Sequence, residues 1–154
     1  MSSMQLFYVL PFFLLIVILN PIHAVDYLVI NNATATLGDA RIEVIGVLYH
    51  ETTRVWQWSG NNEAPIGLIT GIADYVRLKA GWASPHWVQR GSGLRWNEGF
   101  AVTAYFLDYC NALNDGFVAE VNALMKYYYS DSFFVKLMGK SVDELWIDYK
   151  AHYE

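Results

Sequence analysis

Apolar residues between Glu43 and Trp58 recur at the spacing of one face of an α-helix. This stripe contains Val44, Leu48, Val55 and Trp58, with Glu51 in its middle. The adjoining face carries three polar side chains, His50, Arg54 and Gln57. The run Ser59-Gly60-Asn61-Asn62 consists of residues that commonly end helices. The pattern therefore predicts one amphipathic helix whose apolar stripe contains a carboxylate.

The rest of the chain also predicts helices separated by short breaks. Pro65 suits the first turn of a helix, Gly139 suits a C-terminal cap, and Ser141 to Glu144 matches a capping box. The predicted helices are 66–80, 100–113, 117–128, 132–138 and 142–152. No internal repeat or sustained heptad is apparent. The expected fold class is mainly α.

The N-terminal region has a different pattern. Residues 6–19 are apolar and uncharged, and Ala24 suits a cleavage point, so residues 1–24 are predicted to be a signal peptide. The weaker alternative is a retained anchor, for which the apolar run is short. Tyr27 to Ile30 predicts one residual strand with no apparent partner, and Gly38-Asp39 predicts a break before the next helix. Such a strand is disordered, pairs with another chain or remains from a deleted sheet, and the domain is expected to cover 25–154.

Residues 81–98 form a long loop with three tryptophans, Trp82, Trp87 and Trp96. Aromatic packing over the helices is the favoured interpretation, and a sugar or peptide cleft is the alternative. His86, in the same loop, is expected to have an ordinary structural role, although it is a candidate ligand recruited from a distance.

Composition narrows the function classes. The formal net charge is −5 and no basic tract is present, so nucleic-acid binding is not expected. Cys110 is the single cysteine, which excludes an internal disulfide, and a buried thiol is the favoured interpretation. Asn32 begins a glycosylation sequon that has meaning if the leader directs secretion. After cleavage no stable membrane anchor is expected.

The helix from Glu43 contains a zinc-protease pattern with one residue changed. In H-E-x-x-H, two imidazoles four residues apart bind Zn²⁺, and the Glu is the general base for metal-bound water. His50 and Glu51 match that pattern, but Arg54 occupies the second imidazole's position. A guanidinium has no free lone pair and stays charged, so Arg54 cannot bind a metal and repels a divalent cation.

Three stretches resemble the plant basic secretory protein family, secreted proteins placed among zincin-like metallopeptidases. They are HETTRVWQW at 50–58, GLITGIADYVRLK at 67–79 and FLDYCN at 106–111. The similarity extends from about Val25 to the C-terminus. Family members typically read HEMTHVWQW and EGIADYVR at the first two places.

The resemblance implies roles for individual residues. His50 matches the first zinc ligand and Glu51 the catalytic base, both vestigial here if zinc is absent. Thr70 stands where a Glu, the expected third ligand, occurs in the family. Asp74 matches a position that supports a ligand or is itself a ligand. Because Arg54 and Thr70 stand at two ligand positions, no bound cofactor is expected in this chain. For intact family members the resemblance implies bound zinc.

The family pattern also has a long segment of strands and a helix before the metal helix, which is almost absent here. The expected architecture is a truncated zincin-like helical domain that lacks the strand on which a peptide substrate lies. An apolar helix stripe without its sheet exposes apolar surface, so self-association is expected. We also consider that Arg54 replaces the zinc charge by pairing with Asp74 or Glu51. The alternative is a simply solvated Arg54.

The expected function is a secreted, catalytically degenerate relative of a zinc peptidase, with a role in plant defence as the resemblance implies. One alternative is an active zinc peptidase that uses His50, Glu51 and unconventional ligands such as Asp74, His86 or Gln57. The other alternative is an extracellular module that binds glycans or peptides through the tryptophan loop.

Overall fold

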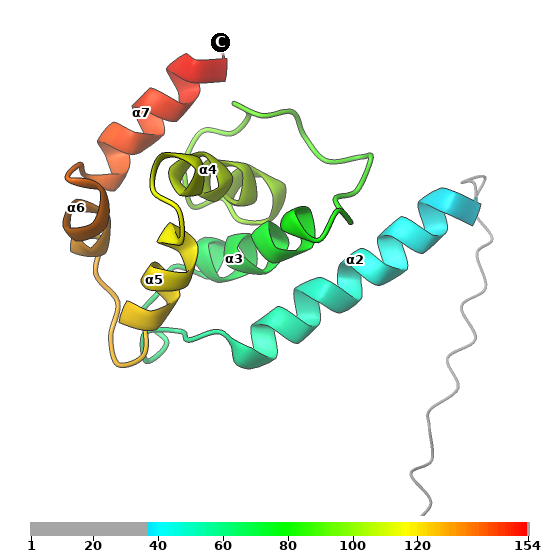
Figure 1. Ribbon diagram of the computed structural model, residues 1–154, viewed down its shortest axis with the longest axis horizontal. Coiled ribbons are helices and arrows are strands. Elements are labelled where there is room, and N and C mark those ends of the chain that lie inside the picture. The colour runs from blue at the N-terminus through cyan, green and yellow to red at the C-terminus, as the bar shows by residue number, and fades with distance from the viewer. Residues whose placement is uncertain (1–36, 154) are drawn as a thin grey trace, which may run out of the picture. The chain divides into compact units, whose positions relative to one another are not determined.

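The computed structural model describes residues 37–153, and within that range the protein is mainly α-helical without a strand (Figure 1). The helices are α2 (Leu37–Trp56), α3 (Ile66–Lys79), α4 (Phe100–Leu113), α5 (Phe117–Leu124), α6 (Ser132–Met138) and α7 (Val142–Tyr153). The predicted mainly α class is therefore confirmed. None of these described helices is long and apolar enough to cross a membrane.

Two helix boundaries differ from the sequence expectation. Helix α2 begins at Leu37, so the Gly38-Asp39 pair that reads as a break lies inside the first turn. Helix α5 ends at Leu124, short of residue 128, and the Met125 carbonyl just after it accepts a hydrogen bond from the Gly60 backbone N–H at 2.9 Å. The predicted signal peptide, strand and Asn32 sequon lie outside the described residues.

The hydrophobic core is built where α3 and α4 pack together and α5, α6 and α7 cover α4. Phe106 is fully buried at its centre and its ring contacts Trp96, Phe134, Trp146 and Tyr149. An aromatic cluster of this kind contributes both apolar burial and favourable ring geometry. The core therefore fixes α4 and, through it, the helix α3 that carries the candidate site.

The close approach of α3 and α4 depends on a glycine. A Cβ added at Gly71 would lie 2.3 Å from Cγ2 of Thr103, closer than real side chains approach. Thr103 is fully buried, and its hydroxyl donates to the Trp96 carbonyl at 2.7 Å. Any larger residue at position 71 would push the two helices apart.

Cys110 lies in this core with no exposed surface. Burial raises the pKa of its thiol, which keeps the sulfur protonated and unreactive. The interpretation of Cys110 as a buried thiol is confirmed.

Candidate functional site

The site is centred on a buried pair between α2 and α3. His50 Nδ1 lies 2.6 Å from Asp74 Oδ1, and the two residues are 7% and 3% exposed. An ionised carboxylate only accepts hydrogen bonds, so the pairing assigns the proton to Nδ1, which donates to Asp74. The imidazole also stacks on the Phe100 ring, with centroids 6.0 Å apart and planes at 17°. His50 is therefore held in one orientation and one tautomer, with Nε2 as its acceptor nitrogen.

The pair forms because α2 and α3 run antiparallel on either side of a short loop. Three contacts define their register. Nearest the loop, Gln57 Nε2 donates to the Ile69 carbonyl at 3.0 Å. The His50–Asp74 pair follows, and nearest the N-terminus of α2, Arg77 donates to Glu43 Oε2 at 2.9 Å. As the residue number falls along α2 it rises along α3. Arg54, one helical turn after His50, is therefore level with Thr70, one turn before Asp74.

Arg54 does not replace the charge of a metal. Its side chain is exposed, and within residues 37–153 no ion pair includes it. Asp74 is instead bound by His50. The hypothesis that Arg54 pairs with Asp74 or Glu51 is wrong, because the antiparallel register places Arg54 beside Thr70. Arg54 lines a surface pocket with Thr70, Arg95, Glu98 and Phe100.

Thr70 is buried, and its hydroxyl is fully used by nearby backbone. Oγ1 donates to the carbonyls of Ile66 and Gly67, at 3.1 and 3.3 Å, and accepts from the Phe100 N–H at 3.4 Å. The bond from Phe100 ties α3 to the start of α4. Phe100 is held there with a φ of 46°, an uncommon conformation for a non-glycine residue, under the ring of His50.

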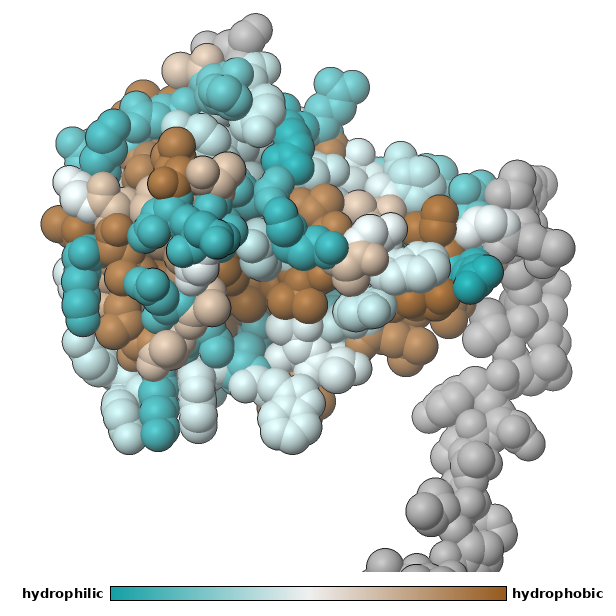
Figure 2. Space-filling model, viewed as in Figure 1, coloured by the Kyte–Doolittle hydropathy of each residue, from teal (hydrophilic) through white to brown (hydrophobic). Residues whose placement is uncertain are grey.

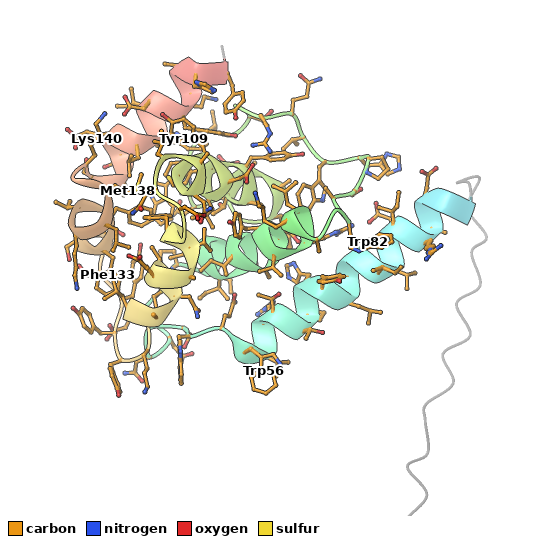
Figure 3. All side chains as sticks on the ribbon, in the orientation of Figure 1. Trp56, Trp82, Tyr109, Phe133, Met138 and Lys140 are labelled. Atoms are coloured by element: carbon orange, nitrogen blue, oxygen red, sulfur yellow. The ribbon has the colours of Figure 1, made fainter. Side chains whose placement is uncertain are left out.

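The tryptophan loop packs back on the helices. Trp96 is 7% exposed and belongs to the core, whereas Trp82 and Trp87 are half-buried. The guanidinium of Arg41 lies over the Trp82 ring and that of Arg77 over the Trp87 ring, at 5.9 and 5.3 Å. Figure 3 shows Trp82 beside α2, away from the end of that helix where Trp56 lies. The three rings do not form one binding surface, so the packing interpretation is confirmed.

These features can be compared with known proteins. The family model BSP, described as "Peptidase of plants and bacteria", matches residues 22–149. The chain belongs to this family. A "Basic secretory protease" of Boswellia serrata is 44% identical over 62 residues, which cover 40% of this chain and 72% of that protein. No solved structure matches the chain. The family resemblance predicted from the three sequence stretches is confirmed.

The residues of this BSP member do not fit a catalytic zinc ion. Catalytic zinc takes three protein ligands and keeps one open position. His50 Nε2 is one suitable donor, but Arg54 repels a cation and the Thr70 hydroxyl is committed to backbone. Among residues 37–153, no group of three His, Cys, Asp or Glu side chains is placed to hold a metal.

Of the unconventional ligands that we considered, Asp74 contacts His50, whereas His86 and Gln57 do not line the pocket beside it. The pocket beside His50 is lined by Val47, Glu51, Asp74, Arg77, Trp87, Phe100 and Ala101. His86 is exposed and lies outside this lining. Gln57 donates to α3 backbone, and its Oε1 is buried without a hydrogen-bond partner. The site thus retains His50, Asp74 and an exposed Glu51.

A second buried group beside the site was missed by sequence reasoning. Arg77 is 6% exposed, and its Nε donates to the Trp82 carbonyl at 2.8 Å while its Nη2 binds Glu43. Burial raises the pKa of Glu43, but hydrogen bonds from Ser84 and Arg77 outweigh that effect and lower it overall. The available signal was the spacing of Asp74 and Arg77, three residues apart on one helix face.

Proposed function

We propose that this BSP member is a secreted, catalytically degenerate relative of the family's peptidases, with a role in plant defence. The carrying observation is the position of Arg54, which replaces the second imidazole and lies level with Thr70, which replaces the acidic ligand. Secretion is supported by the apolar leader at residues 1–24 and by the name of the Boswellia serrata relative. The defence role rests on the family resemblance alone.

The residues that remain at the site would need a metal for catalysis. Glu51 is exposed on α2, and without a metal there is no Lewis acid to lower the pKa of a water that it would deprotonate. His50 donates its Nδ1 proton to Asp74 and stacks on Phe100, which is a stable structural arrangement without a metal. We interpret the His50–Asp74 pair as a structural part of the family's site that is retained. The residues expected to complete the metal site are replaced by Arg54 and Thr70.

A peptidase assay tests this proposal. The purified chain, supplied with equimolar Zn²⁺, is expected to cleave a denatured protein substrate no faster than buffer alone. The Glu51→Gln variant is expected to give the same background, because no base-assisted step exists to remove. Zinc-dependent cleavage that Glu51→Gln abolishes would overturn the proposal and favour the active peptidase with unconventional ligands.

A binding function is the second candidate, and a pocket between α2, α3 and α5 favours it. Its volume is about 540 Å³, within the range of ligand sites, and it combines aromatic rings with amide groups. The relevant lining residues are Tyr49, Trp56, Gln57, Tyr75, Asn111 and Asn122. Flat rings with nearby amides suit a neutral glycan or a peptide. This pocket replaces the tryptophan loop as the place where such a ligand would bind.

Glycan-array binding checks this second candidate. If the pocket binds a glycan, Trp56→Ala is expected to lower the signal at least about tenfold, since Trp56 is 79% exposed and available for stacking. Tyr127→Ala, which removes another exposed ring outside the pocket, is the matched control and should leave the signal unchanged. Equal loss in both variants would show that the binding is not specific to this pocket.

A further inference from the structure

The side of α2 that faces away from α3 is strongly apolar and uncovered by the described residues. Val44, Leu48 and Val55 are 38%, 60% and 76% exposed. Val47 and Trp56 are further exposed apolar residues of the same helix. Figure 2 shows hydrophobic surface gathered over this part of the molecule, and Figure 1 shows α2 extending past the other helices. Single exposed apolar residues are ordinary, but a row along one helix indicates an interaction surface.

The spacing of this row is that of a helix-pairing seam. Val44, Leu48, Glu51 and Val55 follow one another at steps of four, three and four, and Arg41 precedes Val44 by three. Alternating steps of three and four define the positions at which two helices interlock. We call these five residues the α2 seam. Val44 and Leu48 lie between basic Arg41 and acidic Glu51, and Val55 follows Glu51.

The seam is complementary to itself when a second copy runs antiparallel. Centring the pair between Val44 and Leu48 sets Val44 opposite the second copy's Leu48 and Arg41 opposite its Glu51. The twofold axis repeats both contacts, so each pair forms twice. A parallel pair would instead set Glu51 against Glu51 and Arg41 against Arg41, which is unfavourable. We propose that this protein forms a homodimer through antiparallel packing of the α2 seams.

The charged residues of the seam are available for this contact. Arg41 and Glu51 are both exposed, and within residues 37–153 neither forms an ion pair. Arg41 lies over the Trp82 ring at 5.9 Å, an exposed contact that its long side chain can leave. The two residues are about 15 Å apart along one helix, so they cannot pair within one chain.

The bodies of the two copies do not compete for the same space. Val44, Leu48 and Val55 lie on the side of α2 opposite to Gly46 and His50, which are buried against α3. Glu51 lies nearer to His50, because it also lines the pocket beside that residue. Two paired α2 helices would therefore carry the rest of each copy on the outer sides. A second copy fits better than an extended segment of the same chain, because a lone strand laid on a helix leaves its backbone groups unpaired. The α2 seams would pair in the same way with or without zinc at His50.

Sedimentation equilibrium on the full chain, released and processed by a eukaryotic secretory host, tests the dimer. The native chain is expected to sediment as a dimer at micromolar concentration. Leu48→Glu, an exposed position whose change should leave the fold intact by circular dichroism, is expected to give monomers. Ile147→Glu changes a residue of similar exposure, 66%, on α7 and should remain dimeric.

Charge reversal tests the antiparallel register. Arg41→Glu and Glu51→Arg alone are each expected to raise the dimer dissociation constant about tenfold or more, whereas the double variant should restore it. Restoration can only arise between chains, because the two positions are too far apart within one. A native chain that stays monomeric, a dimer that Leu48→Glu leaves intact, or a double variant no better than the single variants would each overturn the proposal.

Discussion

Replacing Arg54 by His and Thr70 by Glu together is expected to create a chain that binds one zinc ion. The change returns an imidazole one turn after His50 on the same helix face and a carboxylate level with it on α3. Asp74 already fixes the Nδ1 proton of His50, so Nε2 is free to bind the metal. Isothermal titration with Zn²⁺ measures the stoichiometry, and elemental analysis of the gel-filtered sample confirms it.

Matched variants separate ligation from a general effect of removing a positive charge. Arg54→Gln with Thr70→Gln changes the same positions and introduces no imidazole or carboxylate, so it is expected to remain zinc-free. Arg54→His alone gives two imidazole ligands, His50 and the new side chain, without the third ligand, so this variant should bind zinc weakly. If the His-Glu variant folds but binds no zinc, the account that substitution of these two positions removed the site is wrong.

Phe106→Ala is expected to lower the free energy of unfolding by about 3–5 kcal/mol, the usual cost of deleting a fully buried aromatic ring. Phe106 has no exposed surface and its ring lies 5.5 to 6.3 Å, between centroids, from four other aromatic rings. Removing it leaves a cavity shared by α4, α6, α7 and the tryptophan loop. Urea unfolding followed by circular dichroism, at one fixed protein concentration, measures the change.

Tyr127→Ala is the control for that measurement. Tyr127 is 73% exposed, so its removal deletes an aromatic side chain of comparable size without opening a cavity, and a change below about 1 kcal/mol is expected. If the two variants lose similar amounts of stability, Phe106 is not the centre of the core.

Local signals were sufficient to predict most helices because the breaks between them are strong. The breaks contain Gly60, Pro65, Gly116 and Gly139, and the three glycines adopt positive φ. The boundaries that differ depend on context. Gly38-Asp39 was read as a break, yet an acidic residue is favourable in the first turn of a helix, where Asp39 lies. Just after the early end of α5, the Met125 carbonyl accepts a hydrogen bond from the distant Gly60 N–H, a contact that no local pattern reveals.

The candidate site was less predictable because it depends on how α2 and α3 are aligned. The sequence identified His50, Asp74 and the substituted positions Arg54 and Thr70, but it could not show which of them meet. The register set by Gln57, His50 and Glu43 pairs Asp74 with His50 and leaves Arg54 beside Thr70. The buried Arg77 network was missed for the same reason, since Glu43 is 34 residues away along the chain.

The zinc content of the unaltered chain shows whether Arg54 and Thr70 have abolished the metal site. The chain is purified with excess Zn²⁺ present, gel-filtered into metal-free buffer and measured by elemental mass spectrometry beside the His50→Ala variant. The account predicts far less than one zinc per chain, with no difference between the two samples. One zinc per native chain that His50→Ala removes would contradict it, because the substitutions at Arg54 and Thr70 would then not have abolished the metal site.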